Sequence, residues 1–308
     1  MTTEHFTNEL PAAPTLEPRQ RFKLDLSGRY RLDRFFKAAT WTATMIALAV
    51  LVWLFCDILI NGIPTLSWRL IASLPASDAD RTGLLAALVG TAWIMVLVTL
   101  FSFPIGVGSG IFLEEFAEDN WFTGFIEINI GNLAGVPSII YGMLGLGAFV
   151  QLFSFVTGGR SVLSGAMTLA LLVLPIIIVA TREALRSVPD SIRSAGYALG
   201  ANRWQVIWSH TLPTAFPGIL TGVILALSRA IGETAPLIVV GAVTYVSFLP
   251  LNPRDAFTVL PIQIYNWVSL PQKEFHSLAA SGIIVLLASL LTMNSIAIFL
   301  RNRFQKAR

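Results

Sequence analysis

Long apolar blocks separated by short polar segments dominate this chain. Each block is near or above the roughly 20 residues that an α-helix needs to cross a bilayer core of about 30 Å. The pattern predicts six membrane-spanning helices, over Ala38–Ile60, Leu84–Leu113, Leu133–Phe155, Leu163–Thr181, Thr214–Val243 and Leu278–Leu300. The expected fold class is therefore an all-α integral membrane protein.

The composition supports this class and excludes others. Of the 308 residues, 55% are hydrophobic and 13% are charged, and the mean hydropathy is +0.70, whereas soluble domains carry about 25% charged residues. The net charge of +3 does not indicate a partner nucleic acid, because the basic residues gather at the ends of predicted spans. The single Cys56 excludes an internal disulfide, and no Cys/His cluster has the spacing of a metal site.

The distribution of Lys and Arg predicts the orientation in the membrane. With the N-terminus inside, seven lie in the N-terminal tail, four in the 182–213 loop and four in the C-terminal tail, against five in the outer loops. Positive residues favour the cytoplasmic side, so both termini are expected to be cytoplasmic. The acidic run Glu114–Asp119 also falls inside, and we interpret Glu114 and Glu115 as a solvated loop edge rather than a site.

These spans divide the chain into four parts. Residues 1–37 are expected to form a largely disordered cytoplasmic tail, because they combine several prolines with mixed charge. Residues 38–83 hold the first transmembrane helix and an outer loop. Residues 84–300 form the core, which includes the 182–213 loop, and residues 301–308 are a cytoplasmic tail.

The 182–213 loop has the local signals of a short helix, a turn and a second short helix. Pro189 suits the first turn of a helix, and Gly200 suits the left-handed position that follows a helix end. Asn202 is a good cap for the second helix, and Gln205 completes a capping box. Pro213 is expected to end that helix before the next span.

Two groups of side chains indicate what this loop does. Small residues in the first helix would allow another backbone to pack closely: Ala195, Gly196 and Ala198. The second helix is expected to present an apolar face: Trp204, Val206, Ile207 and Trp208. Together they favour a protruding surface at the membrane on which another protein docks. The alternative is an interfacial helical hairpin with its tryptophans in the headgroup layer.

Two charges lie inside the fifth predicted span. Arg229 and Glu233 are four residues apart and therefore share one helix face. Charges at membrane depth commonly mark a cavity or pathway, and a planar guanidinium suits tetrahedral oxyanions. We hypothesise that Arg229 lines a translocation path with Glu233 as its partner; the alternative is a structural ion pair. Ser138 and Tyr141 either add hydroxyls to that path, beside a distorted third span, or only pack against other helices.

Other motifs, present or absent, limit the functions that this chain can have. Glycine pairs at close-packing spacing, Gly106/Gly110 and Gly218/Gly222, would let helix backbones approach. The phosphate-cradling motif Gly-x4-Gly-Lys-Ser/Thr is absent. No nucleophile and base stand at a credible spacing, so we predict no catalytic residues and no metal. Any hydrolysis that drives this protein has to come from another subunit.

The loop resembles the EAA coupling loop of ABC importer permeases. The resemblance rests on Ser194-Ala195-Gly196, three residues, Gly200, nine residues and His210-Thr211-Leu212-Pro213. It implies that the residues coupled to the ATPase are Ser194, Ala195, Gly196, Gly200, Asn202, Arg203, Trp204, Leu212 and Pro213. The sequence departs from the family pattern at Ser194, usually Glu, and at Gly196, often Ala.

A longer match is to the phosphate branch of that family, the PstA-type permeases. The matching blocks are Asn132–Gly142, Arg182–Pro189, Ala198–Trp204, Leu212–Gly222 and Ala226–Leu237. The most specific block is the last, which contains Arg-Ala-Ile-Gly-Glu-Thr-Ala-Pro. Together they cover most of residues 84–300.

The resemblance implies a MetI-like fold and a permease that moves phosphate into the cytoplasm by alternating access. It also implies a bacterial inner-membrane location, among lipid, and three partners: a second permease of the PstC type, two copies of a PstB-type ATPase, and an extracytoplasmic phosphate-binding protein of the PstS type. ATP and Mg would bind the ATPase, and this chain would bind no cofactor.

Three other functions stay open. A sulfate or molybdate permease of the same architecture would have the same spans and loop. An ion-driven secondary transporter could use Arg229 and Glu233 for coupling, although the internal repeat expected of many such proteins is not evident. An intramembrane enzyme is disfavoured because no catalytic constellation is present.

Overall fold

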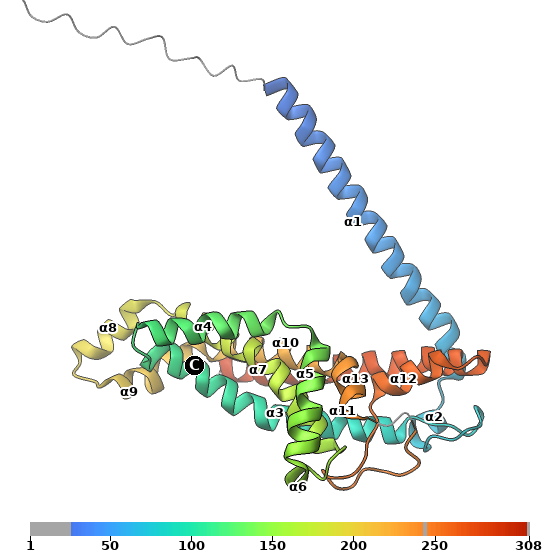
Figure 1. The fold of residues 1–308 in the computed structure, drawn as a ribbon. Helices are drawn as coiled ribbons and strands as arrows, with labels where there is room; N and C mark the ends of the chain where they lie inside the picture. The colour runs from blue at the N-terminus through green and yellow to red at the C-terminus, as the bar shows by residue number, and fades with distance from the viewer. Residues whose placement is uncertain (1–25, 243–244, 307–308) are drawn as a thin grey trace, which may run out of the picture. The chain divides into compact units, whose positions relative to one another are not determined.

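The computed structural model describes residues 26–242 and 245–306, and within these ranges all regular structure is helical (Figure 1). The chain divides into two compact units, Met1–Phe55 and Cys56–Arg308. Helix α1 (Leu26–Gly62) begins well before the predicted Ala38, so residues 26–37 are helical. The earlier part of the predicted tail lies outside the described residues.

The second unit contains the remaining helices. In chain order they are α2 (Trp68–Ala72), α3 (Leu85–Ile111), α4 (Trp121–Ala134), α5 (Ser138–Gly145), α6 (Ser154–Thr157), α7 (Val162–Arg186), α8 (Asp190–Ala198), α9 (Arg203–Val206), α10 (Leu212–Gly232), α11 (Ala235–Val240), α12 (Leu260–Ser269) and α13 (Lys273–Lys306). A 3₁₀ turn covers Ile63–Thr65, and π-helical turns cover Phe112–Phe116, Leu146–Leu152 and Ile207–Thr211.

Helix α7 forms the centre of this unit, with α3 and α10 packed against it. The two predicted glycine pairs both face α7: Gly106 with Gly110 on α3, and Gly218 with Gly222 on α10. A Cβ atom at Gly110 would lie 2.6 Å from Thr181 Cβ, and one at Gly222 would lie 2.2 Å from Ala180 Cβ. The prediction of close helix contacts at these pairs is therefore confirmed.

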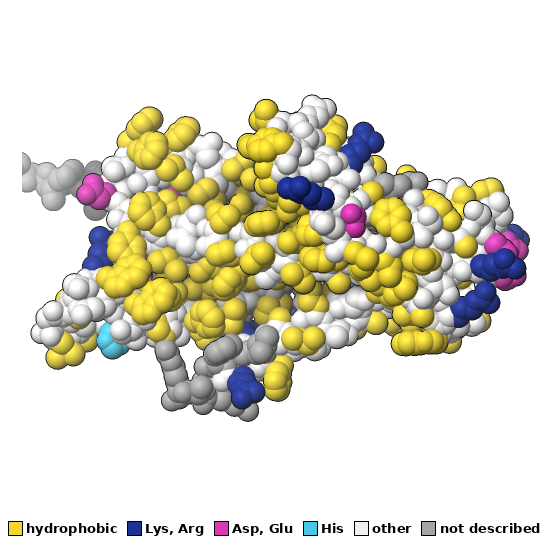
Figure 2. Space-filling model, turned by 90° about the horizontal axis from the view of Figure 1, so that it is seen from below, with side chains coloured by type: hydrophobic (Ala, Val, Ile, Leu, Met, Phe, Trp, Pro, Cys, Tyr) yellow, Lys and Arg dark blue, Asp and Glu magenta, His cyan; other side chains and the backbone are white. Residues whose placement is uncertain are grey.

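Four predicted spans are continuous helices long and apolar enough to cross a membrane. They correspond to Tyr30–Thr65, Leu85–Phe116, Val162–Arg186 and Lys273–Arg303. The face in Figure 2 carries mostly hydrophobic side chains and few charges, as a lipid-facing surface requires.

The distortion predicted in the third span is confirmed as a sharp bend. Two helical segments, Trp121–Ala134 and Ser138–Leu152, meet there at 104°. Pro137 explains the bend, because it has no N–H and its ring clashes with the carbonyl four residues earlier, that of Leu133. The freed Leu133 carbonyl accepts a hydrogen bond from the Tyr141 hydroxyl at 2.8 Å.

The predicted fifth span is also interrupted. Its helical run begins at Arg203 and ends at Gly232, rather than extending to Val243. Pro236 lies four residues after Gly232 and has no N–H to bond the Gly232 carbonyl. Glu233 adopts an extended conformation, and α11 begins at Ala235.

The two interruptions lie against each other. Helix α5, which follows the bend, packs on α11, which follows the break. A Cβ atom at Gly142 would lie only 2.7 Å from Pro236 Cα, so the backbones touch. Discontinuous helices at membrane depth are typical of substrate sites in transport proteins.

The helices place the loop and the C-terminal end together. Helices α10 and α13 run antiparallel, since Ser228 bonds Asn294 at 2.7 Å and Thr221 bonds Arg301 at 3.1 Å. The last turns of α13 therefore lie toward the loop. Figure 1 shows α8 and α9 at one end of the second unit and α2 and α12 toward the other.

Candidate docking loop and intramembrane charge site

The local geometry of the loop follows the sequence prediction closely. Helix α8 is followed by Gly200 in the left-handed conformation, with φ +80°. Asn202 caps α9: its Oδ1 accepts from the Gln205 backbone N–H at 2.8 Å, and Gln205 Oε1 accepts from the Asn202 N–H at 2.9 Å. The predicted turn and capping box are confirmed.

Three details of the prediction are wrong. Pro213 does not end the second helix, because α9 runs through the π turn into α10 and Pro213 lies in the first turn of α10. Val206 and Ile207 are buried rather than presented. Gly196 is buried against Val206, where a Cβ atom would lie 2.8 Å from Val206 Cγ2, so its small size serves the interior of the loop.

The exposed side of the loop is apolar and aromatic. We call it the docking face; its members are Tyr197, Leu199, Trp204 and Trp208, and Leu199 is 87% exposed. The Trp204 and Trp208 rings stack at 5.5 Å. The Arg203 guanidinium lies 5.6 Å from the Phe116 ring centroid, a cation–π distance that fixes the loop against the end of α3.

The other predicted coupling residues border this face. Ser194, Ala195, Gly200 and Asn202 are exposed, whereas Leu212 and Pro213 are half-buried where the loop enters α10. An exposed apolar surface at one end of the helices is a feature that marks protein or membrane contact.

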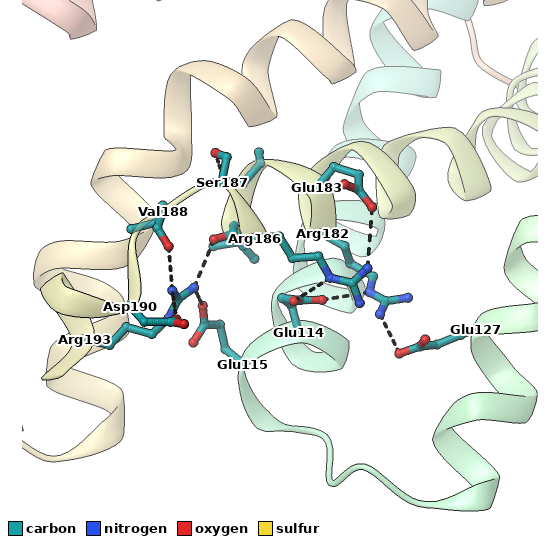
Figure 3. Close-up of polar contacts among 12 residues, drawn as sticks. Glu114, Glu115, Glu127, Arg182, Glu183, Arg186, Ser187, Val188, Asp190 and Arg193 are labelled. Carbon is teal, nitrogen blue, oxygen red and sulfur yellow. Dashed lines mark hydrogen bonds and ion pairs between the residues drawn. The ribbon is translucent and has the colours of Figure 1, made fainter. Parts of the chain in front are cut away.

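A network of ion pairs lies at the base of the loop (Figure 3). We call it the Arg–Glu network; its members are Glu114, Glu115, Glu127, Arg182, Arg186 and Arg193. The interpretation of Glu114 and Glu115 as a solvated edge is wrong, since Glu115 is buried with 7% of its side chain exposed. Glu127 lies between the second and third predicted spans, on helix α4.

Arg182 and Arg186 on α7 hold the neighbouring helices. Arg182 Nε bonds Glu114 Oε2 at 3.2 Å, and its Nη2 bonds Glu127 Oε1 on α4. Arg186 Nε bonds the other oxygen of Glu114 at 2.8 Å. The carboxylate of Glu114 is therefore shared between two arginines.

Arg193 on α8 bonds groups at the end of α3 and around the end of α7. Its Nη2 donates to Glu115 Oε1 at 2.7 Å and to the Leu185 carbonyl at 3.0 Å, while Nη1 donates to the Val188 carbonyl at 2.8 Å. The pKa of Arg193 is raised above its ordinary value, chiefly because the hydrogen bond to Glu115 favours the charged form. Arg193 therefore stays charged throughout the physiological range.

The intramembrane charges form the predicted pair. Arg229 Nε bonds Glu233 Oε1 at 3.2 Å at the end of α10. The Arg229 side chain is 46% exposed, whereas that of Glu233 is largely buried. Ser138 and Tyr141 lie on α5 just after the bend, and Arg229 and Glu233 lie at the end of α10 just before the break. All four predicted path residues therefore lie at the two helix interruptions.

The two hydroxyl residues differ in what they offer. Ser138 is half-buried at the start of α5. The Tyr141 proton is committed to the Leu133 carbonyl, so Tyr141 holds the bend and offers only its oxygen as an acceptor. Within residues 26–242 and 245–306, no group of three His, Cys, Asp or Glu side chains is arranged to hold a metal ion.

A helical membrane protein with a docking face at one end and a charged pair at interrupted helices has the architecture of a transporter subunit. The model of the family described as "Binding-protein-dependent transport system inner membrane component" matches residues 102–306, and the chain belongs to this family of multi-pass inner-membrane proteins. Family members are transport subunits that work with a substrate-binding protein and a separate ATPase.

Within the family, the similar curated proteins include phosphate permeases. The chain is 34% identical over 273 residues to the phosphate transport system permease protein PstA of Haemophilus influenzae, covering 89% of this chain and 94% of that protein. It is also 34% identical over 272 residues to the probable ABC transporter permease protein YqgI of Bacillus subtilis, covering 84% and 91%.

Solved structures confirm the fold. A chain of a bacterial alginate ABC transporter, in complex with an alginate-bound periplasmic protein, matches with a TM-score of 0.66 and 15% identity, over 91% of this chain and 98% of that one. A chain of the inward-facing MetNI methionine ABC transporter matches with a TM-score of 0.58 and 16% identity, over 72% and 95%. The predicted MetI-like permease fold is therefore confirmed.

Proposed function

We propose that this chain is a permease subunit of an ATP-driven phosphate importer and that Arg229 contacts phosphate in the translocation path. The single observation that carries the proposal is the half-exposed guanidinium at the paired helix interruptions. The PstA names of several relatives, one of them 34% identical over most of the chain, supply the substrate class.

The geometry of the pair suits reversible anion binding. Glu233 engages only the Nε of Arg229 in the pair that joins them, and a guanidinium has five N–H donors in a planar fork. The remaining donors match the oxygens of a tetrahedral oxyanion. Glu233 neutralises Arg229 when the path is empty, and phosphate competes for the same cation when it enters.

The partners and the energy source come from the same proposal. A PstC-type permease, two PstB-type ATPases and a PstS-type phosphate-binding protein complete the importer. ATP and Mg bind the ATPases, which contact the docking face, and this chain carries no cofactor. This arrangement requires both termini in the cytoplasm, which a reporter fused to the C-terminus would check: activity of a periplasm-specific reporter there contradicts it.

The alternatives differ in measurable ways. Sulfate and molybdate are also tetrahedral oxyanions, and the helices alone do not distinguish them from phosphate. An ion-driven transporter would not need the exposed docking face on Tyr197, Leu199, Trp204 and Trp208. Substrate competition and the requirement for ATP therefore separate the proposal from its rivals.

The proposal predicts a specific loss of phosphate uptake on removing one charge. Cells lacking this chain would be complemented with wild type or Arg229→Gln, and radiolabelled phosphate uptake measured with excess cold sulfate. Wild type should restore uptake that resists sulfate, and Arg229→Gln should lower it by about one to two orders of magnitude, as expected when a charge-assisted contact worth about 1.5–3 kcal/mol is lost.

The matched control is Arg81→Gln, which removes the same charge from an exposed loop. It should leave uptake unchanged, and immunoblots should show all three proteins at equal membrane levels. Full competition by sulfate would contradict the substrate assignment. Normal uptake by Arg229→Gln would contradict the role of Arg229.

A further inference from the structure

The Arg–Glu network connects the first helix of the loop, α8, to the ends of α3 and α7, and connects α7 to α4. Helix α8 packs mainly on its own loop partners, α9 and the π turn over Ile207–Thr211. We propose that the Arg193–Glu115 and Glu114–Arg182–Glu127 contacts transmit motion of the docking face to α3 and α4, as positioning residues for transport. The inference rests on the proposed function, because it assumes an ATPase that moves the loop.

Arg193 is the first step of this connection. It reaches the end of α7 through the Leu185 and Val188 carbonyls, and the end of α3 through Glu115. The Leu185 carbonyl also accepts from the Val188 N–H at 3.2 Å, so the guanidinium adds a further bond where α7 ends and the chain turns toward α8. One side chain thereby joins α8 to two membrane helices.

Because the Arg193–Glu115 contact is buried, it is expected to hold α8 rigidly against the end of α3. The side chains of Arg193 and Glu115 are only 17% and 7% exposed. Separating the pair would leave the buried Glu115 carboxylate without its cation in a low-dielectric environment, which is strongly unfavourable, and would leave Arg193 only the exposed Asp190 as an acidic partner among the residues that the structure describes. The end of α3 is therefore expected to follow α8 when the docking face is displaced.

The second step extends the connection to α4. Arg182 on α7 binds Glu114 at the end of α3 and Glu127 in the middle of α4, as Figure 3 shows. About two helical turns beyond Glu127, α4 reaches the bend at Gly135. Across that bend, the Tyr141 hydroxyl on α5 bonds the Leu133 carbonyl of α4, and α5 packs on α11, which begins just after the helix break at Glu233. The network, α4 and α5 therefore connect the docking face to the helix break at which the charged pair lies.

The experiment measures two quantities on the purified complex, with its ATPase and binding protein, in lipid vesicles. One is phosphate transported per ATP hydrolysed. The other does not depend on the substrate: the change that ATP with vanadate causes in a spin label at Ile128→Cys on α4, an exposed position, with Cys56→Ser as background.

Glu115→Gln tests the Arg193–Glu115 contact, and Asp190→Asn is the matched control. Both remove a carboxylate that binds Arg193, but Asp190 is 96% exposed. Glu115→Gln should lower the transport ratio by at least about fivefold and abolish the ATP-dependent change of the label, while ATP hydrolysis continues. Asp190→Asn should stay within about twofold of wild type.

Non-additivity separates coupling from general damage. Arg193→Gln should lower the ratio at least as much as Glu115→Gln, because it also removes the bonds to Leu185 and Val188, and the double variant should be no worse than Arg193→Gln. If Glu115→Gln does not assemble, Arg193→Lys replaces it, since lysine keeps the charge and loses the fork. An unchanged ratio and label response in the assembled variants, or equal losses in Asp190→Asn, would overturn the inference. A wild-type complex that shifts the label yet moves no phosphate would refute the proposed function instead.

Discussion

Arg229 and Glu233 show how a single pair of residues defines a membrane site. A charge at membrane depth costs about 2.5–3.5 kcal/mol on insertion scales, so it persists where a partner or cavity offsets that cost. Here Glu233 is largely buried, and Arg229 keeps 46% of its side chain exposed. That asymmetry favours an anion-binding role over a closed structural pair.

Gly200 gives a residue-scale prediction about the docking loop. It has φ +80°, and a Cβ atom there would meet no other atom within 4 Å. A side chain is therefore disfavoured only by backbone conformation, which costs about 1–2 kcal/mol for most residues and less for Asn. Gly200→Val should weaken co-purification of the ATPase, and Gly200→Asn should weaken it less.

The control for this prediction is Gly124→Val, at a position that also has open space but ordinary backbone angles. It should leave ATPase binding intact. Equal binding by wild type and Gly200→Val would show that the left-handed turn is dispensable for docking.

Local residues were predictable and distant pairs were not. Gly200, Asn202 and Gln205 follow rules that operate within a few residues, and the structure confirms them. Glu115 and Arg193 are 78 positions apart, so no local rule joins them. One feature of the sequence indicated such ion pairs: the acidic run was predicted on the same side of the membrane as most of the arginines.

At the scale of elements, hydropathy located the spans but not their continuity. Hydropathy averaged along the chain shows which segments are apolar enough to lie in a membrane. The third and fifth spans are apolar enough despite their interruptions. Pro137 indicated a distortion of the third span. The 104° bend also depends on the Tyr141–Leu133 bond and on the close packing of Gly142 against Pro236, which the pattern does not contain.

The contact between the two interruptions leads to a prediction. Gly142→Ala places a methyl group 2.7 Å from Pro236 Cα, and backbone atoms cannot move away as a flexible side chain would. The expected cost is about 1–3 kcal/mol, seen as a lower melting temperature of the purified complex and reduced uptake.

The matched control is Gly147→Ala, where no atom lies within 4 Å of the new Cβ. Alanine favours helices by about 1 kcal/mol over glycine, so this variant should be neutral or slightly stabilised. The account of the paired interruptions fails if Gly142→Ala melts and transports like Gly147→Ala.

At the scale of the whole molecule, the docking face, the Arg–Glu network and the charged pair occupy different places in the second unit. The docking face, the Arg–Glu network and the last turns of α13 lie toward one end of the second unit. The charged pair lies deeper, where α5 and α11 meet. The all-α membrane class and the docking loop were predictable from the apolar blocks and the loop motif, but the Arg–Glu network was not. The sidedness in the membrane stays a prediction.

The most direct test of the central claim is phosphate accumulation by the purified importer in sealed vesicles, with its binding protein outside and ATP inside. The account predicts accumulation that requires both ATP and this chain, resists excess sulfate, and persists when ion gradients are collapsed. Accumulation driven by an ion gradient without ATP, or abolished by sulfate, would contradict it.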